Sequence, residues 1–374
     1  MKHVLVACCL ASSLFTFSQG PQNLGPKINT PEGTECYPQI TPDGQTLFFS
    51  RDADDEPGGY EIFYSTKDEN GAWQEAVPFE SLNNKYKNVV YHASTDGSSL
   101  VVLGSYGDEP STKGFSVIYK TEEGWSEPEV IHFKREEEIK WGNNSCTISS
   151  NGNVMIVSLN QDLHVSWRNE MGIWTFPTKL PDNVNSEGRE YTPFLASDDK
   201  TLYFSSSGHD GLGGNDIFKI TRLDDSWLTW SNPENLGNTI NSSGFESFFK
   251  LNAEGNKALV YSLSEGDGDL FEVDVPKEHR PEPVSLVKGV ITNKKSEPLN
   301  NVRISYGYKG YDPLGTAMTI PQTGSFSFIL KTIGTYQLVI SADGYKPSII
   351  DVNIEEVDNY REIDLSKVVL KKEK

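Results

Sequence analysis

The 374-residue chain has few of the residues and none of the motifs that mark the common enzyme classes. It has four cysteines and six histidines, and none of them is spaced as a zinc site requires. It has no nucleophile elbow and no phosphate-binding loop. Beyond the N-terminus, no apolar run is long enough to span a bilayer. These absences exclude the motif-defined hydrolases, nucleotide-binding folds and zinc proteins, and they predict no transmembrane segment.

Basic residues are also scarce. The chain has 33 Lys and Arg residues against 53 Asp and Glu residues, which gives a formal net charge of −20. Such a surface repels nucleic acid and anionic lipid, so we expect no nucleic-acid partner. The charge is compatible with cationic partners or divalent ions, although acidity for solubility alone is the simpler interpretation.

The first residues have the composition of a leader. Met1–His3 is basic, and Val4–Phe17 is apolar but too short to cross a bilayer. We therefore predict a secretory signal peptide over residues 1–18 and an exported protein. Leu5–Cys8 resembles a lipoprotein cleavage box, but only about four apolar residues would precede the cut, so an unlipidated protein is favoured.

One pattern occurs five times in the chain. Each copy has an apolar stretch, a tight turn and a second apolar stretch. The turns are anchored at Asp43-Gly44, Asp96-Gly97, Asn151-Gly152, Asp198 and Glu254-Gly255. Successive anchors lie 53, 55, 47 and 56 residues apart. A period of this size, with several short strands in each unit, indicates a β-propeller.

Each copy fits a four-stranded blade. The turn joins the two inner strands, because Gly and Asn adopt positive φ at little cost. A Gly-rich loop leads to the third strand, as in Gly211–Phe218, where that strand begins at Asp216. The outer strand is expected to carry a Trp and a Pro, since proline suits an edge strand. The tryptophans are Trp73, Trp125, Trp174 and Trp230.

The fifth copy lacks its outer strand, and the missing piece occurs at the other end of the chain. Pro21–Asn29 repeats Pro233–Asn241 almost residue for residue. We expect the N-terminal segment to supply the last strand and remove the free edge. This favours a five-bladed propeller, with six blades as the alternative. Cys36 and Cys146 would then lie in blades that are not neighbours, so two separate buried thiols are predicted, and no disulfide.

The pattern changes after Lys277–Pro283, a charged and Pro-rich stretch typical of a linker. Roughly seven short strands follow in about 90 residues, which predicts a small antiparallel β-sandwich. The predicted organisation is all-β. It has a signal peptide at 1–18, a propeller at 19–276, a linker at 277–283 and a sandwich at 284–374.

Both halves resemble known families. Thr41–Gly44, Leu202–Ser206 and Gly211–Phe218 resemble the WD40-like (TolB-type) propeller repeat of bacterial envelope proteins. Lys288–Val290 and Ala342–Tyr345, with Pro298 to Val302 and Gly324 to Phe326, resemble the carboxypeptidase regulatory-like domain. The resemblance covers nearly all of the chain after the leader. It implies a place in the periplasm or on the periplasmic face of the outer membrane.

The resemblance also bears on partners. Proteins with this pairing commonly continue into an OmpA-type peptidoglycan-binding domain, and some serve the type IX secretion machinery. No OmpA-type domain and no sorting domain is visible in this sequence. The resemblance therefore implies an accessory of an outer-membrane or type IX secretion assembly rather than direct anchoring to peptidoglycan.

One set of polar residues recurs at the start of the inner strands. It consists of Glu35, Asn88, Asn143, Glu190 and Glu246. These side chains should face one mouth of the central channel, where they could bind a cation such as calcium. They could also act as acid and base on a glycan. The third interpretation, which the repetition favours, is that each one bonds a backbone N–H of a neighbouring blade and locks the ring.

We expect an exported, non-catalytic scaffold that binds an envelope protein or a glycan. The alternative is a glycan-active enzyme, a glycoside hydrolase or lyase, or a small-ligand or cation-binding protein that uses the acidic channel mouth. No organic cofactor is expected.

Overall fold

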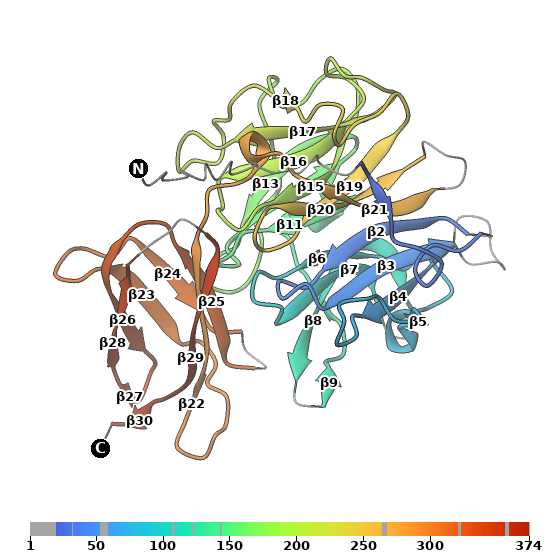
Figure 1. Cartoon of the computed structure of the whole chain (residues 1–374). Coiled ribbons are helices and arrows are strands. Elements are labelled where there is room, and N and C mark those ends of the chain that lie inside the picture. The colour runs from blue at the N-terminus through green and yellow to red at the C-terminus, as the bar shows by residue number, and fades with distance from the viewer. Residues whose placement is uncertain are drawn as a thin grey trace, which may run out of the picture.

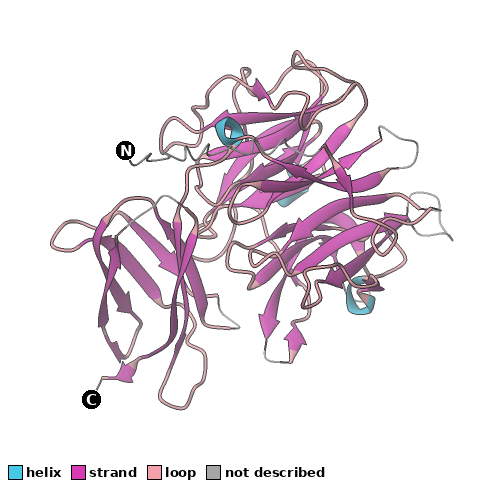
Figure 2. Ribbon diagram, viewed as in Figure 1, coloured by secondary structure: helices cyan, strands magenta, loops and turns pink. Residues whose placement is uncertain are grey.

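A computed structural model describes residues 20–373, except 32, 53–58, 107–108, 122, 143, 264–267, 321–322 and 356–358. The predicted signal peptide lies outside the described residues. The described part is all-β, as expected, with short 3-10 helices η1 (Glu80–Leu82), η2 (Glu136–Glu138) and η3 (Lys277–His279). Figure 2 shows strands throughout both parts of the molecule. Within these residues no helix is long and apolar enough to cross a membrane.

Five antiparallel sheets form the larger part. Four of them follow the chain from the inner to the outer strand, and the fifth takes its outer strand from the N-terminal segment. Sheet one has β2 (Glu35–Ile40), β3 (Thr46–Asp52), β4 (Tyr60–Thr66) and β5 (Val77–Pro78). Sheet two has β6 (Val90–Ala93), β7 (Ser99–Ser105), β8 (Ser111–Thr121), β9 (Gly124–Trp125) and β10 (Glu129–Val130). Sheet three has β11 (Ser145–Ile148), β12 (Val154–Leu159), β13 (Asp162–Trp167) and β14 (Thr178–Lys179).

The last two sheets complete a propeller-like ring (Figure 1). Sheet four has β15 (Glu190–Leu195), β16 (Thr201–Ser206), β17 (Asp216–Thr221) and β18 (Glu234–Asn235). Sheet five has β19 (Glu246–Leu251), β20 (Lys257–Ser262) and β21 (Asp269–Asp274), and its fourth strand is β1 (Gln22–Asn23). Each inner strand lies beside that of the next sheet, and β19 lies beside β2. The inner strands therefore form a closed circle.

The predicted turn residues hold the inner hairpins. Asp43, Asp96 and Asn151 each accept a hydrogen bond from the backbone N–H two residues later. The following glycines, Gly44, Gly97 and Gly152, have φ of +67°, +69° and +72°, a region that suits glycine. Sheet four keeps the same geometry with Asp198, whose carboxylate accepts from the N–H groups of residues 200 and 201.

The tryptophans lie elsewhere than expected. The outer strands are only two residues long, and Trp73, Trp174 and Trp230 precede them. Each of these three forms an isolated bridge to the residue just after the third strand, and Trp174 also bridges Phe133. Trp125 lies in β9, a short extra strand of sheet two. The indoles therefore pack between sheets instead of forming the outer edge, and Trp174 and Trp230 are almost fully buried.

A repeated asparagine ties an outer loop to the third strand in four of the five sheets, a feature that the sequence analysis missed. The Asn29 amide accepts from Leu270 N–H and donates to Leu270 C=O, so it imitates a strand partner. Three other pairs make the same two bonds: Asn83 with Ile62, Asn185 with Leu163, and Asn241 with Ile217. Paired buried amide groups of this kind stabilise the loop because no polar group is left unsatisfied.

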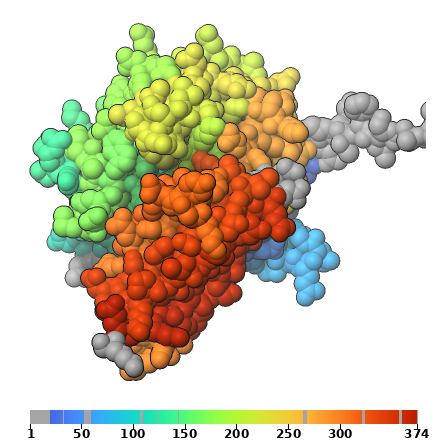
Figure 3. Space-filling model, turned by 90° about the vertical axis from the view of Figure 1, so that its left-hand side faces the viewer, coloured from blue at the N-terminus to red at the C-terminus, as the bar shows by residue number. Residues whose placement is uncertain are grey.

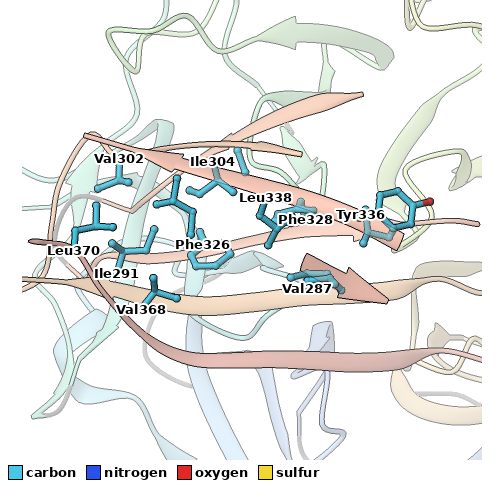
Figure 4. Close-up of a cluster of buried hydrophobic side chains, with 14 of the residues drawn as sticks. Val287, Ile291, Val302, Ile304, Phe326, Phe328, Tyr336, Leu338, Val368 and Leu370 are labelled. Carbon is cyan, nitrogen blue, oxygen red and sulfur yellow. The ribbon is translucent and has the colours of Figure 1, made fainter. Parts of the chain in front are cut away.

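The smaller part has two main sheets around one core. Its strands are β22 (Ser285–Thr292), β25 (Ser325–Leu330) and β29 (Arg361–Val369) in one sheet, and β23 (Arg303–Tyr308), β24 (Gly315–Met318), β26 (Gly334–Ser341) and β28 (Ser348–Ile354) in the other. A third pair joins β27 (Tyr345–Lys346) to β30 (Lys371–Lys372). Side chains from both main sheets, including Val287, Phe328 and Leu338, meet between them (Figure 4). One pair departs from the antiparallel expectation, because β29 runs parallel to β22.

Two further expectations can be compared with the structure. Cys36 and Cys146 are separate buried thiols, as predicted.

The stretch 277–283 is not a free linker, because it is bonded along its length to sheet four. His279 C=O accepts from the Tyr203 hydroxyl, Glu278 C=O accepts from Lys219 Nζ, and Glu282 N–H donates to Asp198.

The N-terminal segment should be required for stability. Deleting residues 20–29 removes the β1–β21 pairing, both Asn29–Leu270 bonds and the buried Ile28 side chain. We expect the free energy of unfolding to fall by at least about 3 kcal/mol, from one buried aliphatic side chain and several hydrogen bonds. Thermal unfolding followed by circular dichroism measures this. Exposed Lys27→Ala is the control, and an unchanged melting temperature in the deletion would show that the ring does not need this segment.

Candidate functional site

The three repeated glutamates are buried and bonded within their own loops. Glu190 accepts hydrogen bonds from the Ser186 N–H (3.0 Å) and the hydroxyls of Ser186 (2.6 Å) and Ser206 (2.7 Å). Glu246 accepts the same three bonds from Ser242 and Ser262. Both carboxylates are at most 1% exposed. Each one fixes the loop that enters its inner strand.

Glu35 has the same role with a different third partner. It accepts from the Thr30 hydroxyl at 2.8 Å and pairs with Arg51, whose Nε lies 2.7 Å from Oε1. Burial raises the pKa of Glu35, and the hydrogen bonds from Thr30 and Arg51 oppose that shift. The Arg51 guanidinium also donates to Ile28 C=O, so this ion pair reaches the N-terminal segment.

Within the described residues, the two asparagines of the set, Asn88 and Asn143, add no ligand for an ion to the three glutamates. Asn88 is buried, and its amide donates to the carbonyls of Tyr60, Asn84 and Tyr86. Asn143 lies outside the described residues. In the part of the chain that the structure describes, no three His, Cys, Asp or Glu side chains gather as a metal site would require. The contacts of the glutamates are structural, but they hold the loop before their own strand, whereas the ring-locking interpretation expected a bond to a neighbouring blade. Asn88 does reach the neighbouring sheet one, through Tyr60 C=O.

The Gly-rich loop before β17 donates its backbone N–H groups to a carboxylate of the fold. Asp216 accepts from the N–H groups of Leu212 and Gly213 and from the Asn235 amide. A Cβ on Gly211 would lie 2.0 Å from the Asp216 carboxylate, so a glycine is needed there. The motif is therefore a turn that closes on its own aspartate, and not a phosphate cradle.

The structural role of the glutamates can be tested at Glu190. Glu190→Gln replaces an acceptor oxygen with an NH2 group that faces other donors, so we expect a loss of about 1–3 kcal/mol in unfolding free energy. Melting should be the same with calcium and with chelator. The exposed neighbour Glu187→Gln is the control and should be neutral. A calcium-dependent rise in melting temperature that Glu190→Gln abolishes would contradict a purely structural role.

The inner strands carry aromatic side chains and a strained backbone at one register. Tyr37, Thr192 and Phe248 have φ of +54°, +49° and +56°, and each lies two residues after one of the glutamates. The strand pairing is shifted at each of these positions, as in a β-bulge. Tyr37 packs against Phe248 at 4.1 Å and Tyr91 at 5.7 Å between ring centroids. The bulges thus turn large side chains toward one another in the centre of the ring.

One lysine is buried among these strands without a carboxylate partner in the described residues. Lys250 is 4% exposed, its Nζ donates to Tyr91 C=O at 3.4 Å, and it lies 5.2 Å from the centroid of the Phe194 ring. Burial lowers its pKa to about 7. Burial, and then the nearby Lys250, also lower the pKa of His92 to about 3.

Lys250 should therefore make stability depend on pH. Between about pH 7 and its ordinary pKa of 10.5, the unfolded chain holds a proton that the folded protein does not. The free energy of unfolding then rises with pH across that window. We expect Lys250→Met to raise the melting temperature at pH 6, where the cost of burying the charge is greatest, and to raise it less at pH 10. Lys257→Met, on the exposed face, is the control. An equal effect at both pH values would contradict a buried charge.

The hollowed part of the structure lies where the two parts of the molecule meet. The C-terminal sheets pack against the larger part (Figure 3). Hydrogen bonds cross the junction from Ser327 to Ser150 C=O (3.1 Å) and from Asn153 to Thr316 C=O (3.5 Å). Beside them Asp199 accepts from Ser150 N–H and hydroxyl, and burial raises its pKa to about 6.

Two hollows open at this junction and together form what we name the domain groove. The first, about 300 Å³, is lined by Tyr119, Arg168 and Trp174 of sheets two and three and by β24 and β25. The second, about 830 Å³, lies between sheet two and the strands β22, β25 and β29. Asp96 and Ser98 line both hollows, so the two meet at the inner turn of sheet two. Sequence analysis identified Asp96 only as a turn anchor, because the groove exists only once the C-terminal sheets have docked.

Comparison with known proteins identifies no family. No protein-family model matches the chain, and no curated protein matches it. Solved structures that are similar include an oligogalacturonate lyase from Vibrio parahaemolyticus, at 12% identity and a TM-score of 0.34 over 69% of this chain and 94% of that one. An α-L-arabinofuranosidase from Lactobacillus brevis matches at 10% identity and a TM-score of 0.37, over 66% and 92%.

A further match is shorter. A mutant of catechol 1,2-dioxygenase from Acinetobacter radioresistens matches at 10% identity and a TM-score of 0.20, over 25% of this chain. The chain spans only 53% of that dioxygenase. Such weak likenesses assign no reaction to the present chain.

These matches correct one expectation. We expected that the chain is not an enzyme, yet the similar propeller-type structures are a lyase and a glycosidase. The prediction of a non-enzyme is therefore not retained, and catalysis becomes a question for experiment.

Proposed function

We propose that this chain is an exported glycan-binding protein of the bacterial cell envelope. In this proposal the five sheets are the blades of a TolB-like WD40 propeller that β1 closes, and the C-terminal sheets are a carboxypeptidase regulatory-like sandwich. The location is the periplasm or the periplasmic face of the outer membrane. The ligand lies in the domain groove, and the groove is the observation that carries the proposal.

The lining of the groove supports a glycan. Seven of the fifteen residues that line the second hollow are serine or threonine, and such hydroxyls pair with the hydroxyls of a sugar. The first hollow adds the hydroxyls of Ser94 and Ser99 to its lining. Because the hollows meet at Asp96 and Ser98, they suit a chain of several sugar units.

The position of the groove supports the same proposal. It lies at a junction between two parts of the chain, where ligand sites are common. Its walls come from β-strands that are anchored in two separate cores, such as β7 and β22. A site built on such rigid walls loses little conformational entropy when a ligand binds.

Binding can be measured with a panel of neutral and acidic oligosaccharides by isothermal titration. Arg168 is exposed and lines the first hollow, so Arg168→Ala should leave folding intact and weaken binding at least about tenfold, or 1.4 kcal/mol. Arg189→Ala is the matched control. Arg189 is also exposed, but it lies just before β15, at the end of that inner strand away from the inner turn.

The same samples separate the competing functions. Shortened oligosaccharides in the incubated mixtures would make the groove a catalytic site as well as a binding site. Failure of the whole panel to bind, or equal loss in both arginine variants, would contradict the proposal. An envelope protein that binds at the groove without any glycan would favour a protein scaffold instead.

A further inference from the structure

The second hollow of the domain groove gathers lysines in a chain that is strongly acidic overall. Lys120 enters from sheet two, and Lys288 and Lys367 enter from β22 and β29. The formal net charge of the chain is −20, so most of its surface repels an anion. The three lysines outnumber the two aspartates, Asp96 and Asp364, that line the same hollow.

Two of these lysines have no ionic partner. Among the described residues, neither Lys120 nor Lys367 has a carboxylate within 4.0 Å, and both side chains are exposed. Lys288 differs, because it pairs with Glu362. Two uncompensated cations from opposite walls are thus available to a ligand.

The carboxylates that share the hollow are bonded locally. Asp96 accepts from the hydroxyls of Ser94 and Ser98 and from Ser98 N–H. Asp364 accepts from Ser366 N–H. Each is still able to accept a hydroxyl through its remaining lone pairs. The walls therefore offer ammonium groups for an anion and oxygen acceptors for hydroxyls in the same space.

A buried hydroxyl adds an independent observation. Thr292 lines this hollow and is 2% exposed, and its Oγ1 has no hydrogen-bond partner among the described residues. A buried polar atom without a partner costs free energy unless something else satisfies it. Because Thr292 Oγ1 is itself buried, a polar ligand would satisfy it only after a small movement of the wall.

We propose that the second hollow selects acidic glycans, with Lys120 and Lys367 holding the anionic groups of adjacent sugar units. This rests on the proposed glycan-binding function and names its ligand class. Lysine recognises an anion as a point charge, so carboxylate and sulfate sugars share the chemistry.

The test compares three oligosaccharides of one length by titration calorimetry. They are a hexauronate, its carboxyl-reduced neutral counterpart and a sulfated form of that neutral chain. We expect the hexauronate to bind at least tenfold tighter than the neutral chain at low salt, and this preference should weaken as added salt screens the charges. The sulfated arm shows whether any anion suffices or a carboxylate is required.

The variants assign the preference to the two lysines. Lys120→Ala with Lys367→Ala should reduce the preference to less than threefold and remove most of its salt dependence, while affinity for the neutral chain stays unchanged. The control is Lys113→Ala with Lys27→Ala, which makes the same change in net charge. Lys113 is exposed at the other end of β8 from Lys120.

The outcomes are distinct. Equal binding of acidic and neutral chains, with Arg168→Ala still weakening both, would overturn the acidic preference and keep the proposed function. Loss of preference in the control pair as well would also overturn it, because overall charge would then be the cause. No binding of any oligosaccharide would overturn both proposals.

Discussion

Closure of the ring by the N-terminal segment is the constraint on which the rest of the structure depends. Four sheets are continuous in sequence, but the fifth takes β1 from the other end of the chain, where Gln22 pairs with Glu272. Without β1, the strand β21 would be an open edge. The Glu35–Arg51 pair and the bond from Arg51 to Ile28 tie the same segment to sheet one. A segment held on both sides fixes the last sheet against the first, and it thereby sets the positions of the inner turns on which the C-terminal sheets rest.

The polar residues that repeat around the ring all maintain it. The glutamates at the strand starts bind the loop before them, and the asparagines such as Asn185 bind the third strand. A side chain that recurs in equivalent surroundings has no reason to differ in protonation from its equivalents, whereas acid–base chemistry needs two groups with different environments. Recurrence therefore points to structure, and selectivity is expected where the repeat is interrupted.

Much of the fold could be predicted from the sequence, and the candidate site could not. Two patterns predicted the sheets and their order. They are the turn spacing from Asp43 to Glu254 and the likeness of Pro21–Asn29 to Pro233–Asn241, and each can be read from short stretches of sequence. The parallel pairing of β29 with β22 has no such signature. The bulges at Tyr37, Thr192 and Phe248 were missed for a related reason, since non-glycine residues with positive φ leave no compositional mark. The domain groove depends on the docking of two separate cores, which no window of sequence contains.

The five inner turns have similar geometry, and docking of the C-terminal sheets gives them different surroundings. The turns at Asp96, Asn151 and Asp198 contact the C-terminal part or the segment leading to it, either directly or through the groove. At the turn of sheet one, by contrast, the hydrogen bonds that the Asp43 carboxylate accepts come from residues 41 and 45 of the same turn. The same carboxylate geometry thus ends a hairpin in one sheet and faces a hollow with unpaired lysines in another. What distinguishes these positions is the surface laid against them, so in the proposed function ligand selectivity arises from the contact between the two parts of the chain and not from the repeat itself.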